Sequence, residues 1–229
     1  MFHRAQEGPY GNSPAMLDAH FGNVARTCTC VLPGEPLAGP RLSVCLTFDD
    51  ATSDFHSVVF PLLQKHNLRA VLAVPPALIG EQAEFREESL ARTEIGGHWH
   101  CTWAGLGAMA ASGRVAIAAH GLTHTRLDRR GIDLDAEISI PREELSSRLK
   151  QPVDSFVFPF GRFSPAALRK VKQHYCYAFR IGGAMNRGWS GSMLYRVDGD
   201  CMQAPDALLS PTRLAACRAR FFWNRLRGR

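Results

Sequence analysis

Short apolar runs rich in β-branched and aromatic residues alternate along this chain with longer stretches whose apolar positions recur at helical spacing. The short runs predict strands at residues 41–48, 69–74, 114–119, 155–158 and 177–181. The longer stretches predict helices at residues 13–25, 55–66, 102–112, 134–149 and 165–174, and residues 81–94 form a polar stretch. This alternation predicts an α/β fold with a mostly parallel sheet, either open or closed into a barrel.

Two adjacent carboxylates end the first predicted strand. Asp49 and Asp50 directly follow an apolar run that ends at Phe48. Successive strand residues point to opposite faces, so both side chains reach one site only if the chain turns there. One carboxylate would then hold a metal while its neighbour handles a proton. The structural alternative is that the pair caps the helix that follows.

Two histidines follow the third predicted strand. His120 and His124 lie four residues apart, which brings both imidazoles to one side if the loop coils into a helical turn. In a chain with nine histidines, such a pair can also be incidental or structural. The C-terminal ends of parallel strands are where active sites form, and two histidines with one carboxylate leave the open position of a catalytic zinc.

The composition is that of one globular domain, because 229 residues with 45% hydrophobic content can bury one substantial core. We expect a leader at residues 1–40 that packs on the barrel, a catalytic region at 41–212 and a basic tail at 213–229. The tail carries six arginines and no acidic residue, within a net charge of +6. Its large apolar residues are Leu214, Phe221, Phe222, Trp223 and Leu226. This pattern predicts either peripheral membrane contact or a helix that packs its aromatic side on the domain.

The seven cysteines form no regular framework, and their odd number indicates a reducing compartment. No stretch approaches the length of a transmembrane span, and the first residues lack the apolar core of a signal peptide. If the sequence begins at its natural start, we therefore expect a cytoplasmic protein, peripheral at the inner membrane if the tail binds lipid.

Three segments follow one another at predicted strand ends, namely Thr47-Phe48-Asp49-Asp50, His120-Gly-Leu-Thr-His124-Thr-Arg-Leu-Asp128 and Phe156-Val-Phe-Pro159-Phe160-Gly161. In this order they resemble the main motifs of the polysaccharide deacetylase superfamily, also called the NodB-homology domain or carbohydrate esterase family four. The resemblance extends from about residue 41 to about residue 197. It implies a distorted (β/α) barrel with about seven parallel strands in a single domain.

The resemblance also implies a role for each matched residue. Asp49 corresponds to the general base, which accepts a proton while a divalent metal, expected to be zinc, polarises the amide carbonyl and lowers the pKa of its water. The implied metal ligands are Asp50, His120 and His124. The implied substrate-binding turn is Pro159, Phe160 and Gly161. The backbone N–H of Phe160 would stabilise the oxyanion.

The sequence departs from the family pattern in two places. An arginine that often orients the base two residues before the proline is replaced by Val157, so one supporting charge is missing. The C-terminal region has no Leu-x-His to supply a general acid. The candidate replacements are His3, His98 and His100, each with an ordinary structural role as its alternative. For Asp198 and Asp200 the alternatives are substrate binding and loop capping.

These observations predict a metal-dependent deacylase that removes an acetyl or formyl group from the nitrogen of an amino sugar. We expect a lipid-linked or nucleotide-linked sugar of surface polysaccharide, lipopolysaccharide or O-antigen biosynthesis as substrate, and no nucleic-acid partner. The alternatives are a carbohydrate-binding domain with a vestigial metal site and a metal-dependent amidohydrolase on a non-sugar amide.

Overall fold

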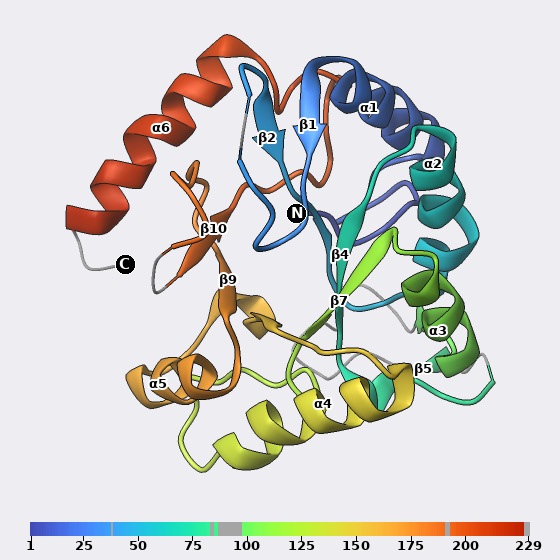
Figure 1. Ribbon diagram of the computed structural model, residues 1–229, viewed down its shortest axis with the longest axis vertical. Helices are drawn as coiled ribbons and strands as arrows, with labels where there is room; N and C mark the ends of the chain where they lie inside the picture. The colour runs from blue at the N-terminus through green and yellow to red at the C-terminus, as the bar shows by residue number, and fades with distance from the viewer. Residues whose placement is uncertain (38, 83–84, 87–97, 191–192, 227–229) are drawn as a thin grey trace.

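Six parallel strands form the centre of the molecule, and helices surround this half-barrel sheet on its outside (Figure 1). The computed structural model describes residues 1–37, 39–82, 85–86, 98–190 and 193–226. The strand order is β10-β9-β8-β7-β4-β3. The strands are β3 (Leu46–Phe48), β4 (Ala70–Val74), β7 (Val115–Ala119), β8 (Ser155–Val157), β9 (Tyr177–Ile181) and β10 (Leu194–Arg196). The parallel α/β barrel-type architecture predicted from the sequence is confirmed.

The first predicted strand, residues 41–48, is divided in the structure. Its first part, β2 (Leu42–Val44), pairs in parallel with β1 (Cys28–Cys30), whereas its second part, β3, pairs with β4. Within the described residues, the main sheet therefore has six strands where about seven were expected, and β1 and β2 form a separate two-stranded sheet. The short strands β5 (Phe85–Arg86) and β6 (His98–Trp99) pair antiparallel, and most of the polar stretch 81–94 lies outside the described residues.

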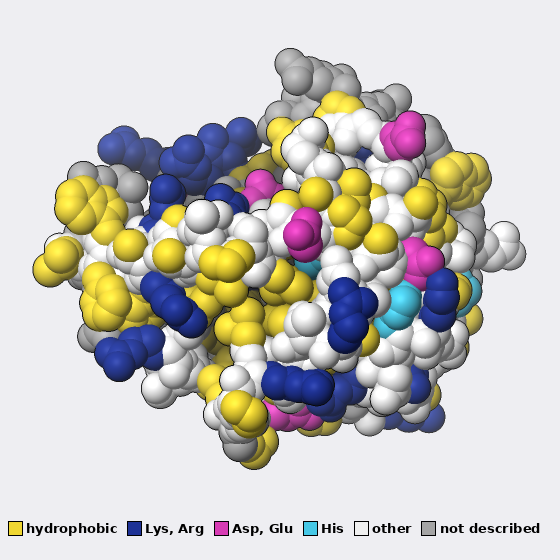
Figure 2. Space-filling view, turned by 90° about the horizontal axis from the view of Figure 1, so that it is seen from above, with side chains coloured by type: hydrophobic (Ala, Val, Ile, Leu, Met, Phe, Trp, Pro, Cys, Tyr) yellow, Lys and Arg dark blue, Asp and Glu magenta, His cyan; other side chains and the backbone are white. Residues whose placement is uncertain are grey.

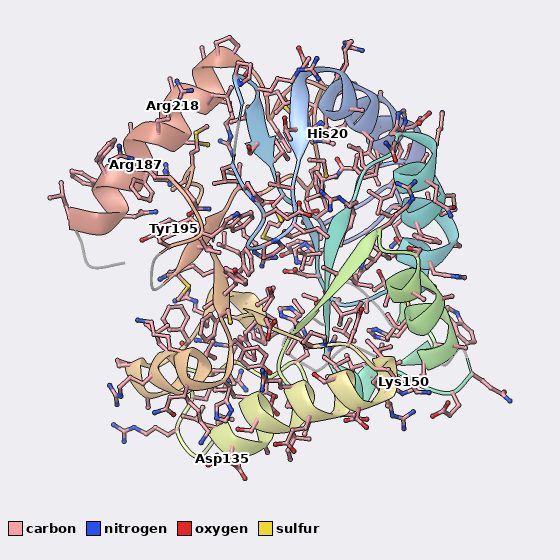
Figure 3. All side chains as sticks on the ribbon, in the orientation of Figure 1. His20, Asp135, Lys150, Arg187, Tyr195 and Arg218 are labelled. Carbon is pink, nitrogen blue, oxygen red and sulfur yellow. The ribbon has the colours of Figure 1, made fainter. Side chains whose placement is uncertain are left out.

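The helices begin close to where the sequence predicts them, because side chains accept hydrogen bonds from their first N–H groups. These capping residues are Ser13, Thr102, Asp133 and Ser164. The helices are α1 (Pro14–Thr27), α2 (Phe60–Lys65), α3 (Trp103–Ala111), α4 (Leu134–Leu149), α5 (Pro165–His174) and α6 (Pro211–Leu226), and a π-helical turn at Phe55–Val59 leads into α2. Figure 3 labels Asp135 in the first turn of α4 and Lys150, the left-handed residue that ends it.

The core lies between the helices and the sheet and is formed mainly by aromatic and branched apolar side chains. Phe48 at the end of β3 is fully buried and contacts the rings of Phe2 and Phe55, each at a centroid distance of 5.1 Å. Burial of such side chains is worth about 1.5 to 3 kcal/mol each. The packing of Phe48 therefore fixes the strand end immediately before Asp49.

The first residues of the chain lie between the two edges of the half-barrel. Phe2 donates its N–H to Thr47 O of β3 at 2.9 Å, and its own carbonyl accepts the N–H of Asp49 at 3.0 Å. On the other side, the Met1 amino nitrogen donates to Val197 O at 2.6 Å, directly after β10. The segment that begins the chain thus joins β3 to the residues that follow β10.

Candidate active site

The turn after β3 directs two neighbouring carboxylates to adjacent parts of one site. Asp50 and Ala51 have φ angles of 72° and 51°, in the left-handed region that non-glycine residues seldom adopt. Such residues cost about 1 to 3 kcal/mol each and cluster at functional sites. Asp49 and Asp50 are both buried, and their carboxylates face Arg196 and the two histidines. The helix-cap alternative for this pair is therefore wrong.

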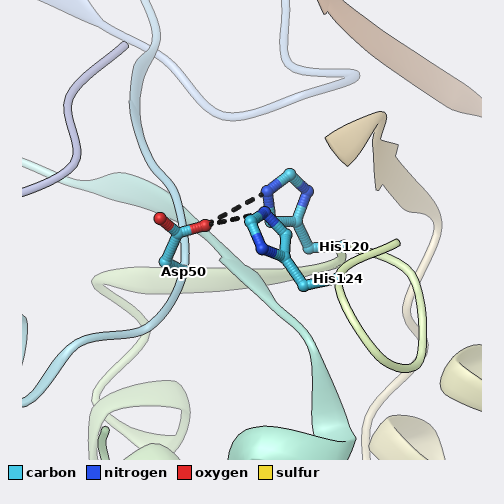
Figure 4. Close-up of side chains that lie close together, drawn as sticks. All are labelled: Asp50, His120 and His124. Atoms are coloured by element: carbon cyan, nitrogen blue, oxygen red, sulfur yellow. Dashed lines mark ion pairs between the residues drawn. The ribbon is translucent and has the colours of Figure 1, made fainter. Parts of the chain in front are cut away.

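Asp50, His120 and His124 meet as a possible metal site (Figure 4). The Asp50 Oδ1 lies 3.1 Å from His124 Nε2 and 3.4 Å from His120 Nε2. All three side chains are buried, and one ligand atom from each lies within 4.8 Å of the others. Two imidazole nitrogens and one carboxylate oxygen are the donor set of a catalytic divalent cation, so these residues fit such an ion.

The two histidines come together in their loop without the helical turn that their spacing suggested as one way to do so. Gly121 and His124 adopt φ angles of 72° and 59°, so left-handed residues bring the imidazoles together, with ring centroids 4.8 Å apart. Buried Glu137 of α4 holds this loop by accepting the N–H of Leu122 at 2.9 Å and the hydroxyl of Thr123 at 2.6 Å. A Cβ at Gly121 would lie 2.9 Å from the Glu137 carboxylate, so both backbone freedom and space require glycine there.

Each histidine is oriented by a second contact. His120 Nδ1 lies 2.8 Å from Val157 O, and because a carbonyl only accepts, this nitrogen carries the proton and leaves Nε2 to face Asp50. The ring of Phe160 stacks on His124 at 4.7 Å. Phe160 has φ 56°, within the turn Pro159–Gly161 that follows β8. The turn singled out in the sequence therefore lies beside the metal site.

Asp49 is held by an arginine that the sequence analysis missed. The Arg196 guanidinium donates from Nη1 to Oδ1 at 2.6 Å and from Nη2 to Oδ2 at 2.8 Å, with both residues buried. Burial by itself raises the pKa of Asp49, but the charge of Arg196, followed by His120, outweighs it and holds that pKa well below its usual range. The supporting charge expected to be missing at Val157 is present and comes from β10.

His3 lies on the other side of Asp49. Its Nδ1 is 2.5 Å from Asp200 Oδ2, its backbone N–H donates to Asp200 Oδ1 at 3.0 Å, and its Nε2 is 3.9 Å from Asp49 Oδ2. Burial lowers the pKa of His3, but the hydrogen bond to Asp200 and the charges of Asp50 and Asp49 together raise it above the ordinary 6.5. An imidazole with this orientation and raised pKa can donate a proton into the site.

The other two candidate acids are placed differently. His100 is buried, and its Nδ1 lies 3.0 Å from the backbone oxygen of Asp50, so it supports the turn. The side chain of His98 lies outside the described part of the chain. Asp200 orients His3 rather than capping a loop, whereas Asp198 accepts the N–H of Asp200 at 3.0 Å.

A cavity of about 370 Å³ connects these groups. Asp49, His120, His3 and Phe160 line it together with Tyr10 and Asp198. Three arginines on the segments after β7 and β8 also line it, namely Arg126, Arg129 and Arg162. Asp128 on the first of these segments pairs with Arg126 at 2.8 Å. The described part of this wall therefore carries excess positive charge.

The fold and the His/His/Asp site are those of a metal-dependent hydrolase on a distorted (β/α) barrel. The family model described as polysaccharide deacetylase matches residues 38–178, more than half of the chain. The chain belongs to the polysaccharide deacetylase family. It is therefore an enzyme that hydrolyses carbon–nitrogen bonds of amides with a divalent metal, and the family as a whole implies an acetylated saccharide substrate. No curated protein matches the sequence.

Several solved structures share this fold at low sequence identity. The Streptococcus pyogenes deacetylase PplD in complex with acetate has a TM-score of 0.74 at 19% identity, covering 91% of this chain and 94% of that chain. A de-N-acetylase from Aggregatibacter actinomycetemcomitans has a TM-score of 0.73 at 18% identity, with 87% and 93% covered. IcaB from Ammonifex degensii has a TM-score of 0.72 at 18% identity, with 87% and 90% covered. The fold expectation is confirmed over nearly the whole chain.

Proposed function

We propose that this protein is a zinc-dependent deacylase that removes an acetyl or formyl group from an amino sugar attached to a phosphate. The observation that carries the proposal is the buried Asp49 carboxylate, held by Arg196 in a cavity that His120 of the metal triad also lines. A binding protein has no need of an oriented carboxylate beside three metal ligands. Seven free cysteines support a cytoplasmic location, where nucleotide-linked and lipid-linked sugars of surface polysaccharides and O-antigens are assembled.

Asp49 acts as the general base. Its lowered pKa keeps it ionised, and the two hydrogen bonds from Arg196 fix the direction of its free electron pairs. It accepts the proton of the attacking water as the carbon–oxygen bond forms. When held by Asp50, His120 and His124, a divalent metal supplies Lewis acidity to the amide carbonyl and to water. The backbone N–H of Phe160 supports the charge that develops on the carbonyl oxygen, since its turn lines the cavity.

His3 acts as the general acid. Breaking the carbon–nitrogen bond leaves an amine that must take up a proton, and Nε2 of His3 faces the cavity 3.9 Å from Asp49. Asp200 holds the opposite ring nitrogen and stabilises the protonated ring. Asp49 and His3 thus occupy positions suited to the two proton transfers of amide hydrolysis, which release a carboxylate and a free amine.

The arginines of the cavity wall support a phosphate next to the sugar. Guanidinium groups bind phosphate through paired hydrogen bonds, and three of them line one side of the cavity. A neutral polymer has no group that would use this charge. A lipid-linked or nucleotide-linked amino sugar carries a phosphate that these arginines could bind.

The test is release of free amine by the zinc-loaded protein from N-acetyl and N-formyl amino sugars, each offered as the free sugar and as the sugar phosphate. We expect turnover of the phosphate forms, and Asp49→Asn should abolish turnover while metal content is unchanged. An active Asp49→Asn variant would remove the assigned base. Tight metal and sugar binding without any amine release would instead establish a carbohydrate-binding domain, and turnover confined to non-sugar amides would establish a metal-dependent amidohydrolase on a non-sugar amide.

A further inference from the structure

Helix α6 has two apolar faces. The inner face packs on the domain through Leu214, buried Cys217 and Phe221, whose ring lies 6.3 Å from that of Tyr195 on β10. At 3.6 residues per turn, the opposite face carries Ala215, Ala216, Ala219, Phe222, Trp223 and Leu226. Phe222, Trp223 and Leu226 are 57%, 54% and 82% exposed. Packing of an aromatic side on the domain, the alternative to membrane contact, therefore explains the inner face of α6 but not the outer one.

Arginines lie along both borders between these faces. Helical spacing places Arg213 and Arg220 on one border and Arg218 on the other, and all three side chains are exposed. Figure 3 labels Arg218 on α6. Figure 2 shows hydrophobic side chains exposed next to Lys and Arg side chains on the side of the molecule that carries α6. The sequence of α6 contains no acidic residue.

We propose that α6 binds the surface of an anionic lipid bilayer, lying in the plane of the interface with its outer face inserted. An outward apolar face between rows of arginine has the charge and shape for this position, because the apolar side chains enter the acyl boundary while the guanidinium groups reach the headgroups. Aromatic residues such as Trp223 favour the headgroup level. None of the helices in the described part of the chain has the length and apolarity of a membrane span. This inference holds whatever sugar the site accepts.

The experiment is co-sedimentation of the full chain with vesicles of phosphatidylcholine alone and of an equimolar mixture with phosphatidylglycerol. We expect binding to the anionic vesicles, with a blue shift of the tryptophan emission that is lost in Trp223→Phe. The double variant Phe222→Ser with Trp223→Ser should reduce the partition coefficient by more than about tenfold. Arg218→Ala should reduce it about fivefold, which corresponds to one headgroup contact.

Two control variants test whether a loss of vesicle binding is specific to α6. Ile140→Ser removes an exposed apolar side chain from α4, and Arg169→Ala removes an exposed arginine from α5. Both should bind vesicles like the unmodified protein, and all variants should keep the same circular dichroism spectrum and melting temperature. Absence of binding to anionic vesicles overturns the proposal, as does equal binding by the Phe222 and Trp223 double variant. A concentration-dependent dimer that this double variant abolishes, without vesicle binding, would show that a second copy covers the face instead.

Discussion

Arg196 donates two hydrogen bonds to the carboxylate of Asp49 across a sequence separation of 147 residues. The pair joins the two outermost strands of the main sheet, since Asp49 follows β3 and Arg196 ends β10. It fixes the orientation of the Asp49 carboxylate, the proposed base, and keeps it ionised. In this chain, the arginine that supports the proposed base therefore comes from β10 rather than from the strand that precedes Pro159.

We expect Arg196→Lys to lower kcat roughly 100-fold, because an ammonium group cannot reproduce the paired hydrogen bonds and the base loses its alignment. Metal content should not change. Arg196→Met should in addition lower the free energy of unfolding by about 3 to 5 kcal/mol, since it leaves a buried carboxylate without its charge partner. Steady-state kinetics and urea denaturation measure the two effects, with the half-exposed Arg180→Lys as the control. Full activity of Arg196→Lys would contradict the assigned role.

His3 and Asp200 should act as one unit. His3→Gln and Asp200→Asn should each reduce kcat/KM roughly 100-fold, and the double variant should be little worse than either single variant. If the losses of the two single variants add up in the double variant, His3 and Asp200 do not act as one unit.

The pH profile gives a second test of the same pair. A general acid must be protonated, so activity falls as pH rises through the pKa of His3, which Asp200 raises. Asp200→Asn should therefore move the alkaline limb of kcat/KM to lower pH. If the alkaline limb of kcat/KM does not move in Asp200→Asn, the general acid is a group other than His3.

Glu137 accepts hydrogen bonds from the loop that carries His120 and His124, two of the proposed metal ligands. Glu137→Gln places an amide donor against N–H groups, so the loop loosens, and we expect zinc affinity to fall about 10- to 100-fold. Competition with a chelating dye measures the affinity directly. Glu144→Gln on the same helix is the control, because its contact is an ion pair with Arg148 at 3.6 Å. Equal zinc affinity in both variants would contradict the positioning role.

Removing the metal should destabilise the fold. Ligand binding to the native state alone stabilises it, by about 4 kcal/mol at a thousandfold excess over the dissociation constant. A chelator should therefore lower Tm, and added zinc should restore it. Asp50→Asn should show a much smaller shift with zinc, which makes this readout independent of catalysis.

His20 on α1, labelled in Figure 3, should make the fold sensitive to mild acid. Burial lowers its pKa below the ordinary 6.5, although the hydrogen bond to Pro205 O, at 2.7 Å, acts in the opposite direction. The unfolded chain therefore binds the proton more readily, and stability falls as pH drops through 6.5, by at most about 1.4 kcal/mol per pH unit for this group. In His20→Gln, the urea midpoint should change less between neutral and mildly acidic pH than it does in the unmodified protein. The exposed His56→Gln should leave this pH dependence as it is. An unchanged slope in His20→Gln would contradict this assignment.

The sequence identifies the elements whose pattern is long enough to carry periodicity. The helices at α4 and α5 and the strand β9 have the predicted bounds, because their apolar spacing and capping residues are local. Strands β1 and β10 were missed, since three residues of mixed polarity show no period. The metal ligands follow from motifs at strand ends. The contacts of Arg196 with Asp49 and of Asp200 with His3 cannot be predicted from such motifs, because each joins segments that are distant in the sequence and that only the folded barrel brings together.

The joining of Met1–Phe2 to both edges of the half-barrel has a consequence for synthesis on the ribosome. Met1 O accepts the N–H of Gly199, and Asp49 finds its arginine at position 196, so the first and the last parts of the barrel must both be present. A domain folds as one unit. A nascent chain therefore holds no aligned Asp49 carboxylate until residue 199 has left the exit tunnel, and a chain that ends before β10 would lack both the arginine and the carbonyl and amide partners of its first residues.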